Sequence, residues 1–287
     1  MQILYHANCS DGLCAAWLCY QLWPKAKYIP VQYGSEPPEI EKDATLILDF
    51  SYSKQTLLKL AHTAAYLIVL DHHKSAQQEL QNLEFCIFDM DKSGARLTWE
   101  YLCKTYSDMV KSQFVMHSGL WRTNKTAHTT FENPPWLVAY TEDRDLWKFK
   151  LSHSEEINCA IRSYPATFEA WDLLSLKDYL DLAAEGTAIM RYRKKLISEH
   201  IKYVADINID GHIVRACQCT AVDISSELAG ELAKDKPFGV VWTSVDDYRI
   251  YQLRSDKNGV DVSEVAKKFG GGGHARAAGF KSKEIFK

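Results

Sequence analysis

The sequence contains 287 residues, of which 46% are hydrophobic and 12% aromatic, and its formal net charge is −3. This composition suits a globular protein with one large or two moderate cores, and the length favours two domains. The slightly negative charge excludes a uniformly basic protein that wraps a long nucleic acid. A small or short anionic ligand fits this charge better than a long duplex does.

Eight cysteines are scattered along the chain, without the paired spacing of a structural zinc site or a dense disulfide framework. This pattern is typical of reduced thiols in the cytosol. The first residues lack a leader pattern, and no stretch offers about 18 uninterrupted apolar residues for a membrane span. We therefore expect a soluble cytoplasmic protein that does not enter a membrane.

The first part of the chain alternates apolar, strand-like runs with helix-like segments. Strands are predicted at residues 1–5, 45–49, 66–71 and 85–88, and helices at residues 13–23, 53–61 and from Ser93 onward. Continuous apolar strands that alternate with helices favour a parallel sheet covered on both faces. Residues 107–135 are polar and predict an irregular loop, and residues 174–204 predict a mainly helical segment.

From about residue 207 the pattern changes to short strands, at residues 212–219, 238–243 and 248–254. The predicted fold class is α/β, with a parallel-sheet domain at residues 1–185, a helical linker at 186–206 and a smaller α/β domain at 207–287. The eight tryptophans are expected in the core or at the domain interface, although one at a ligand-binding cleft could stack a base.

Polar side chains follow the predicted strands of the first domain; they are His6, Asp11, Asp49, Asp71, His72 and His73. Ligands of parallel sheets gather beyond the carboxyl ends of the strands, so these side chains are expected to converge. Their mixed nitrogen and oxygen donors suit two cations such as Mn²⁺ or Mg²⁺, and without a cation the carboxylates would repel one another. Asp143 is a further candidate, whereas Asp145 is expected to brace the core and not to touch substrate.

Two cations about 4 Å apart could bridge a water molecule, lower its pKa and neutralise the charge that develops in phosphoester hydrolysis. Hydroxide would then be the nucleophile, because no Ser/His/Asp order with an elbow motif is present. Replacing Asp71 by Ala is expected to abolish activity and to leave the fold largely intact, since a carboxylate at the surface of a site contributes little packing. By itself, Asp71-His72-His73 also fits a strand-end turn with two solvated histidines.

A second cluster lies near the C-terminus, where Gly270, Gly271, Gly272 and Gly273 precede His274. Consecutive glycines are unfavourable in chain entropy, so they indicate a backbone that must approach something closely. The N–H groups of such a loop can form an anion-binding nest, and Arg254 and His274 could donate to phosphate oxygens. For the loop alone, a flexible turn is the alternative.

In this order, the clusters resemble the DHH phosphoesterases that carry a C-terminal DHH-associated domain. The matching positions are His6, Asp11-Gly12, Asp49, Asp71-His72-His73, Asp143 and the run from Gly270 through His274 to Gly279. This superfamily includes nano-oligonucleotide ribonucleases, cyclic dinucleotide phosphodiesterases and RecJ-type exonucleases. The resemblance covers nearly the whole chain and uses two distant signatures.

The resemblance implies a catalytic metal-binding domain, a substrate-binding domain and a cleft between them. The metal ligands that it implies are His6, Asp11, Asp49, Asp71, His72 and Asp143, with Asp49 as the bridging ligand and His73 stabilising the site or the substrate phosphate. The substrate-binding residues that it implies are Arg254, Gly271, Gly272, Gly273 and His274. Many relatives carry an Asp where this chain has Cys9, so Cys9 is a candidate thiolate ligand and the identity of the metal stays open.

The expected function is a Mn²⁺-dependent phosphodiesterase that uses two ions, or Mg²⁺ in their place, to cut short oligonucleotides. A cyclic dinucleotide phosphodiesterase, a phosphatase of nucleotide bisphosphates and a nucleotide-binding protein without turnover are the alternatives. The sequence does not distinguish RNA from DNA as substrate, and it leaves open whether the chain forms a homodimer.

Overall fold

The computed structural model describes residues 1–115 and 133–286. The chain divides into two compact units, Met1–Ile189 and Met190–Lys287. The boundary falls within helix α9 (Tyr179–His200), which continues without a break through Gly186. Each unit is described by itself.

The first unit contains β1 (Gln2–His6), α1 (Ser10–Leu22), β2 (Lys27–Val31), β3 (Ala44–Leu48), α2 (Lys54–Thr63), β4 (Tyr66–Asp71), α3 (Lys74–Leu80), β5 (Cys86–Phe88), α4 (Gly94–Thr105), α5 (Ser107–Val110), the π-helix η1 (Lys111–Val115), α6 (Trp136–Asp145), α7 (Ser154–Ile161) and α8 (Phe168–Ser175). The prediction of a loop at 107–135 was wrong for its first residues, which form α5 and η1. Residues 116–132 lie outside the described part of the chain.

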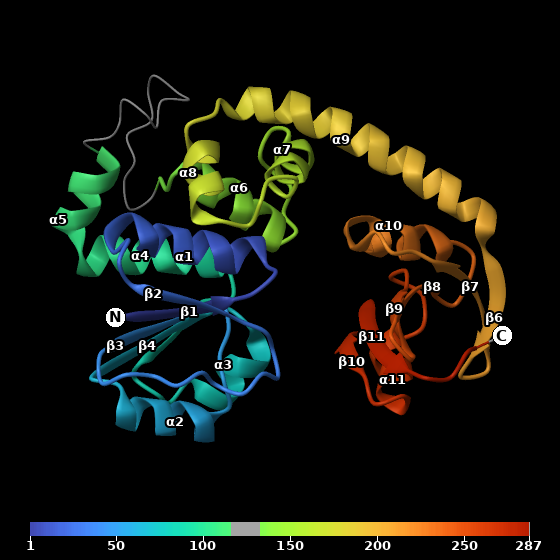
Figure 1. Cartoon of the computed structure of the whole chain (residues 1–287), viewed down its shortest axis with the longest axis horizontal. Coiled ribbons are helices and arrows are strands. Elements are labelled where there is room, and N and C mark those ends of the chain that lie inside the picture. Colours follow the sequence, from blue (N-terminus) through green and yellow to red (C-terminus); the bar gives the residue numbers. More distant parts are fainter. Residues whose placement is uncertain (116–132, 287) are drawn as a thin grey trace. The chain divides into compact units, whose positions relative to one another are not determined.

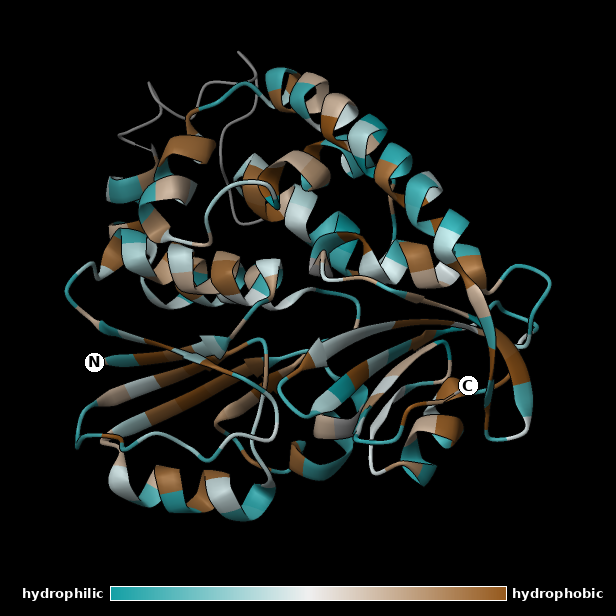
Figure 2. Ribbon diagram, turned by 45° about the vertical axis from the view of Figure 1, so that its right-hand side comes forward, coloured by the Kyte–Doolittle hydropathy of each residue, from teal (hydrophilic) through white to brown (hydrophobic). Residues whose placement is uncertain are grey.

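The five strands of the first unit form a parallel sheet in the order β2-β1-β3-β4-β5. Helices α1 and α4 lie on one face of it and α2 and α3 on the other (Figure 1). Neighbouring strand residues point to opposite faces, so that Ile3 packs with the α1 side and Leu4 with the α2 side. Because both faces of the central strands β1, β3 and β4 are largely buried, these strands are mainly apolar, and brown dominates there in Figure 2. The predicted α/β class is confirmed.

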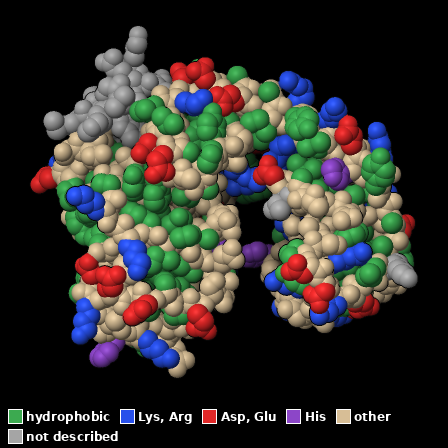
Figure 3. All heavy atoms as spheres, in the orientation of Figure 1, with side chains coloured by type: hydrophobic (Ala, Val, Ile, Leu, Met, Phe, Trp, Pro, Cys, Tyr) green, Lys and Arg blue, Asp and Glu red, His purple; other side chains and the backbone are tan. Residues whose placement is uncertain are grey.

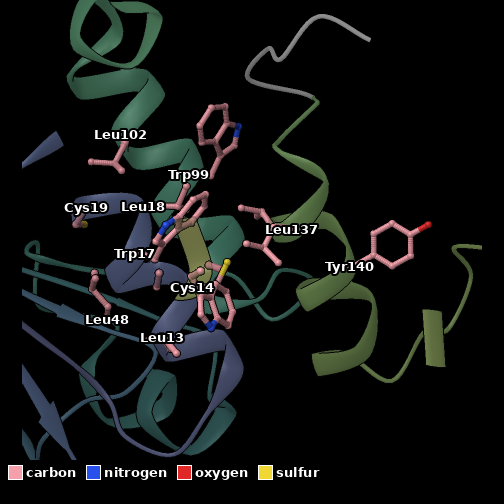
Figure 4. Packing of buried hydrophobic residues seen from close by; sticks show 14 of the residues in the cluster. Leu13, Cys14, Trp17, Leu18, Cys19, Leu48, Trp99, Leu102, Leu137 and Tyr140 are labelled. Atoms are coloured by element: carbon pink, nitrogen blue, oxygen red, sulfur yellow. The ribbon is translucent and has the colours of Figure 1, made fainter. Parts of the chain in front are cut away.

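The core beside α1 is built from large aromatic side chains. Trp17 of α1 and Trp99 of α4 are almost completely buried, and Leu137 of α6 points toward them (Figure 4). Each indole removes about 150 Å² or more of surface from water, which stabilises the fold by roughly 4 kcal/mol at 25 cal/mol/Å². This layer fixes α1 against the sheet, and with it the polar loop at the N-terminus of α1.

The second unit contains the end of α9, the 3₁₀ turn η2 (Ile201–Tyr203), β6 (Ala205–Ile209), β7 (His212–Gln218), α10 (Val222–Leu232), β8 (Gly239–Val245), β9 (Tyr248–Arg254), α11 (Val262–Lys268), β10 (Gly272–His274) and β11 (Ala277–Ser282). Its six strands form a sheet in the order β10-β11-β9-β8-β7-β6, in which β7 and β8 are parallel and the other neighbours antiparallel. Helix α11 packs on one face and α10 on the other, because successive residues such as Val240 and Val241 point to opposite sides.

Acidic and basic side chains are interspersed over both units on the face shown in Figure 3. Among the helices that the structure describes, none is both long and apolar enough to cross a membrane.

Candidate metal centre

The carboxyl ends of β1, β3 and β4 meet at one edge of the parallel sheet. The chain leaves β1 toward α1 on one face and leaves β3 toward α2 on the other, and such a divergence opens a crevice between neighbouring strands. His6 is the last residue of β1, Asp49 directly follows β3, and Asp71 is the last residue of β4. The predicted convergence of polar side chains therefore has its structural basis in the strand order.

Asp49 lies at the centre of this edge and is 1% exposed. Its φ of 64° is in the left-handed region, which directs the carboxylate between two histidines. Asp49 Oδ2 lies 3.3 Å from His6 Nδ1, and Asp49 Oδ1 lies 3.2 Å from His72 Nε2. Burial by itself would raise the pKa of Asp49, but the bonds to His6 and His72 outweigh it and hold that pKa below its ordinary value.

Three carboxylates surround a single nitrogen of His72. His72 Nε2 lies 3.2 Å from Asp49 Oδ1, 3.5 Å from Asp145 Oδ2 and 3.9 Å from Asp11 Oδ2. Burial and the repulsion from Asp49 raise the pKa values of both Asp11 and Asp145. Burial lowers the pKa of His72, but the hydrogen bond that His72 donates to Asp49 and the charges of Asp145 and Asp49 outweigh burial, so the pKa is raised. One imidazolium therefore faces up to three negative charges.

The donor atoms are close enough to hold cations. Ligand atoms lie within 4.8 Å of one another in three groups: His6, Cys9 and Asp49; Asp49, His72 and His73; and Asp11, His72 and Asp145. Asp145 Oδ2 is buried and has no hydrogen-bond partner among the described residues. A buried carboxylate oxygen without a partner is costly unless an ion completes it. The residues thus fit divalent cations, and Asp49 belongs to two of the three groups.

The N-terminus of α4 holds Asp11 in place. Asp11 accepts hydrogen bonds from the backbone N–H groups of Gly94 at 2.5 Å and Ala95 at 3.0 Å, and it is 1% exposed. A Cβ atom on Gly94 would lie 2.6 Å from Asp49 Cβ and 2.9 Å from Asp11 Oδ2. Glycine is therefore required where α4 approaches the two carboxylates.

Asp71 is completely buried, and protein groups occupy its carboxylate. Ser51 Oγ donates to Oδ2 at 2.8 Å, and the backbone N–H groups of His72 and His73 donate to Oδ1 at 2.7 and 3.2 Å. His73 Nδ1 also lies 2.6 Å from Oδ1. Asp71 is in none of the three ligand groups found among the described residues. We expected Asp71→Ala to leave the fold intact because a carboxylate at the surface of a site contributes little packing. That reason was wrong, because Asp71 is buried and its removal would leave several donors without an acceptor.

His73 points to the rim of the site. Burial lowers its pKa, but the hydrogen bond to Asp71 outweighs burial and the pKa is raised. The hydroxyl of Tyr33 lies 3.0 Å from His73 Nδ1 and 3.1 Å from Nε2, and the Tyr33 ring contacts His6 edge-on at 4.6 Å. Tyr33 follows β2 at the same edge of the sheet, so it closes one side of the centre.

Asp143 is the predicted ligand that the structure does not bring to the cluster. Its carboxylate accepts hydrogen bonds from the backbone N–H groups of Lys150 at 2.9 Å and Leu151 at 3.1 Å. Residues 136–145 form a helix, in which two residues two positions apart point about 200° away from each other. Asp145 faces the cluster in its place, so the expectation that Asp145 only braces the core was wrong.

Sequence reasoning missed Asp145, Tyr33, Ser51 and Gly94. A helix at residues 136–145 would have shown that Asp143 and Asp145 point to different sides, although not which of the two faces the crevice. Tyr33 follows β2, whose sequence includes an interior proline and gave a weak strand signal. The contacts of Ser51 and Gly94 depend on packing between segments far apart in the chain.

Cys9 connects the centre to a neighbouring hollow. It is the N-cap residue of α1 and belongs to the group with His6 and Asp49. Burial and the carboxylates of Asp49 and Asp11 raise the pKa of its thiol. Beside it lies a hollow of about 410 Å³ with walls from β1, α1 and the segment between α7 and α8; its lining includes Tyr5, Asn8, Cys9, Arg162, Tyr164 and Trp171.

In the second unit, part of the glycine run is used by the fold itself. The N–H groups of Gly270 and Gly271 donate to carbonyls of α11, those of Lys267 and Ala266. Gly271 and Gly273 also approach the backbone of β11 too closely for a Cβ atom. The run therefore ends a helix and forms a hairpin, which explains Gly270, Gly271 and Gly273 without a ligand.

The remaining predicted residues of the second unit lie near this hairpin. Gly272, Gly273 and His274 form β10 and are exposed, whereas Gly271 is partly buried. Arg254 ends β9 opposite Ala277; its guanidinium donates to Ser226 Oγ at 3.0 Å and to the Leu253 carbonyl at 2.9 Å. Burial lowers the pKa of Arg254.

Comparison with known proteins identifies the second unit. A family model described as the DHHA1 domain matches residues 213–286. Uncharacterized protein R106 of Acanthamoeba polyphaga mimivirus is 28% identical over 96% of this chain and 66% of its own length. Oligoribonuclease NrnB of Bacillus subtilis is 24% identical over 83% of this chain and 59% of its own. This chain thus spans about two thirds or less of the length of these relatives.

A solved structure shares the fold. RecJ of Thermus thermophilus, in complex with Mn²⁺, matches with a TM-score of 0.52 and 16% sequence identity, over 97% of this chain and 49% of that chain.

The metal-free protein is predicted to lose stability as the pH rises above the ordinary pKa values of aspartate, 3.8, and histidine, 6.5. The folded-state pKa values of Asp11, Asp145, His72 and His73 are raised, so the folded state holds protons that the unfolded state releases. Their contribution to stability is present at low pH and is lost as the pH rises through the raised values. Mn²⁺ at about 100 times its Kd should restore roughly 2.7 kcal/mol at pH 8.

Denaturant unfolding at several pH values, with chelator or Mn²⁺, measures this effect. Asp145→Asn should stabilise the metal-free protein at pH 8 and reduce the gain from Mn²⁺. Asp108→Asn is the matched control, because Asp108 is exposed on α5. An equal pH dependence in all three proteins would contradict the predicted repulsion.

Gly94→Ala is predicted to disrupt the centre. The new methyl group would overlap Asp49 and Asp11, which we expect to destabilise the fold by about 1–3 kcal/mol and to weaken metal binding at least about tenfold. Gly230→Ala is the control, since a Cβ atom there meets nothing within 4 Å and α10 should gain up to about 1 kcal/mol. Unfolding and metal titrations measure both; unchanged metal affinity in Gly94→Ala would show that the close approach is unimportant.

Proposed function

We propose that this chain is a phosphoesterase of the DHH family, and that it is a Mn²⁺-dependent phosphodiesterase that hydrolyses short oligonucleotides. The observation that carries the proposal is the group of three carboxylates around His72 Nε2, with Asp145 Oδ2 buried and without a hydrogen-bond partner among the described residues. Bound cations would balance the negative charge that the carboxylates of such a site carry.

Two cations would share Asp49 between them. Asp11, His72 and Asp145 would hold one of them, and His6 and Cys9 the other. When bound, divalent cations lower the pKa of a coordinated water molecule and neutralise the charge that builds up on a phosphate in hydrolysis. The mixed donors suit Mn²⁺, and the RecJ structure with Mn²⁺ shares this fold.

The protein's own residues would orient the substrate around these ions. Asp71 fixes His73 through Nδ1, and with Tyr33 it keeps the ring at the rim of the site. In that place an imidazole N–H can donate to a non-bridging oxygen of the scissile phosphate. Asp71 thereby acts by positioning His73, while Asp49 would share its oxygens between the histidines and the ions, and Asp145 Oδ2 has no hydrogen-bond partner among the described residues.

A short substrate fits the surroundings of the centre. The hollow beside Cys9, at about 410 Å³, has the size of a site for a small ligand such as a nucleoside, and aromatic side chains contribute to its walls. Within the second unit, the exposed Gly272, Gly273 and His274 would bind a phosphate, with Arg254 on a neighbouring strand. The similarity to an oligoribonuclease supports a linear substrate.

The cysteines support a cytoplasmic location. All eight are free thiols, which persist in a reducing compartment.

Purified protein with Mn²⁺ should release mononucleotides from a labelled linear dinucleotide. Asp145→Asn should lower both Mn²⁺ affinity and turnover at least about tenfold. Asp143→Asn should keep the Mn²⁺ affinity of the wild type, because Asp143 bonds to the backbone and not to the cluster. Calorimetric Mn²⁺ titration and product separation make the two measurements.

The products distinguish the alternatives. Release of inorganic phosphate would point to a phosphatase, and cleavage of cyclic dinucleotides in preference to linear ones would identify a cyclic dinucleotide phosphodiesterase. The proposal is wrong if no product forms from any of these substrates with Mn²⁺, Mg²⁺ or Co²⁺. Equal Mn²⁺ affinities in the two variants would overturn the assignment of Asp145.

Cys9 should give one cation position a thiolate ligand. Its Sγ lies within 4.8 Å of ligand atoms of His6 and Asp49, and a sulfur donor favours Co²⁺ and Zn²⁺ over Mg²⁺. Co²⁺ added to the wild type is expected to produce a near-ultraviolet sulfur-to-cobalt absorption band, which Cys9→Ser should abolish. Cys103→Ser, in the partly buried thiol of α4, is the control. Bound Co²⁺ without this band would show that Cys9 is not a ligand.

A further inference from the structure

Trp147 occupies an unfavourable position directly after α6. Its φ is 55°, in the left-handed region that helix ends normally fill with glycine, and a bulky residue is rare there. Its side chain is 75% exposed, so a large aromatic surface faces water. Neither feature benefits the stability of the fold. A strained and exposed residue of this kind is characteristic of a functional surface.

The loop that carries Trp147 is firmly held. The Asp143 carboxylate accepts from the N–H groups of Lys150 and Leu151, and the Asp143 carbonyl accepts from those of Lys148 at 2.8 Å and Phe149 at 3.2 Å. The ring of Phe149 packs edge-on against that of Trp147, with centroids 5.0 Å apart. One buried aspartate therefore fixes the whole turn and the direction in which Trp147 projects.

This turn lies at the same edge of the sheet as the metal centre. Asp145 belongs to the cluster, and two residues of chain span at most about 7 Å, so the Trp147 backbone lies within that distance of the Asp145 backbone. Lys148 Nζ donates to the Asp91 carbonyl at 3.2 Å, which ties the turn to the segment after β5. The carboxyl end of β5 pairs with that of β4, because Phe88 lies opposite Asp71.

We propose that Trp147 stacks on a nucleobase of the substrate and that Asp143 is a positioning residue for it. This inference rests on the proposed function, and it defines the substrate further as a nucleic acid with an unstacked, single-stranded base beside the scissile phosphate. An aromatic face accepts any base, since every base has a π-surface. Lys148 and Lys150, both exposed, would add positive charge next to the phosphate chain.

A rigid turn makes this stacking effective. An exposed side chain on a mobile loop would lose conformational freedom on binding, whereas the hydrogen bonds of Asp143 have already fixed the turn. In this arrangement the two aspartates have different roles. The Asp143 carboxylate holds the backbone of residues 150–151, and Asp145, two positions later, faces the metal centre.

Steady-state kinetics on a linear dinucleotide and on an analogue without the bases tests the proposal. Trp147→Ala should raise KM for the dinucleotide about tenfold or more and leave kcat and Mn²⁺ affinity close to wild type. Trp147→Phe should restore most of the loss, because phenylalanine keeps an aromatic face. The analogue should give the same KM with all three proteins.

Two further variants separate stacking from a structural role. Trp147→Gly should raise the melting temperature, since glycine relieves the left-handed strain, while it weakens dinucleotide binding as Trp147→Ala does. Asp143→Asn should raise KM with kcat and metal affinity retained. Tyr192→Ala is the control for removing an exposed aromatic ring, as Tyr192 is 59% exposed on α9.

Calorimetry can measure the affinity for a nucleoside monophosphate without any hydrolysis, so this test is independent of the test of the proposed function. Weaker binding to Trp147→Ala supports stacking even if the wild type hydrolyses none of the substrates. Equal binding to both proteins overturns the proposal, as does an equal rise of KM for the dinucleotide and for the analogue. A melting temperature that falls in Trp147→Gly, with nucleotide binding unchanged, would show that Trp147 serves the fold and would overturn the proposal.

Discussion

The repulsion among Asp11, Asp49 and Asp145 is the constraint on which this structure depends. Their oxygens lie within 3.9 Å of one nitrogen of His72, and Asp11 and Asp49 are almost completely buried. Burial alone disfavours a carboxylate, and each neighbour of like charge adds to that effect. A single imidazolium cannot balance three such groups. The fold therefore keeps together carboxylates that repel one another, and bound cations would relieve this repulsion.

Several unrelated parts of the first unit hold these charges in place. The N-terminus of α4 directs two N–H groups at Asp11, and the positive end of the helix favours the charged carboxylate there. The left-handed backbone of Asp49 turns its side chain into the crevice. Behind both, the aromatic layer around Trp17 and Trp99 anchors α1 and α4 to the sheet. Loss of any one support would leave the repulsion without opposition.

The strand ends of the site could be predicted from the sequence, because they depend on a local pattern. Apolar runs that end in His6, Asp49 and Asp71 place these residues at one edge whatever the details of packing. The sequence pattern could not show in the same way that Asp145, and not Asp143, faces the metal centre. Which of the two does so depends on the rotation of α6 about its axis, and the apolar residues of that segment do not fix the rotation to within the 200° that separates the two side chains.

The glycine run shows a different limit of sequence reasoning. Four glycines indicate close approach of the backbone, and the structure does contain that approach, but its partner is strand β11 of the same sheet. A run of glycines indicates that another group approaches the backbone closely. Only the tertiary fold shows whether that group is a ligand or another segment of the chain. His274 is exposed and β10 is the edge strand of its sheet, so a ligand could still reach this position.

Aspartates in and beside the centre differ in the partners of their oxygens. Asp71 and Asp143 are buried, and each accepts backbone N–H donors on its carboxylate, so each shapes the chain around it. Asp49 and Asp145 accept no backbone donor on their carboxylates in any hydrogen bond found among the described residues, and both carboxylates face His72. Asp11 accepts backbone N–H groups on both oxygens and still belongs to a ligand group, so backbone donors by themselves do not exclude a carboxylate from the cluster. Position at the crevice and the acceptor capacity left on each oxygen together decide which carboxylates are suited to bind metal.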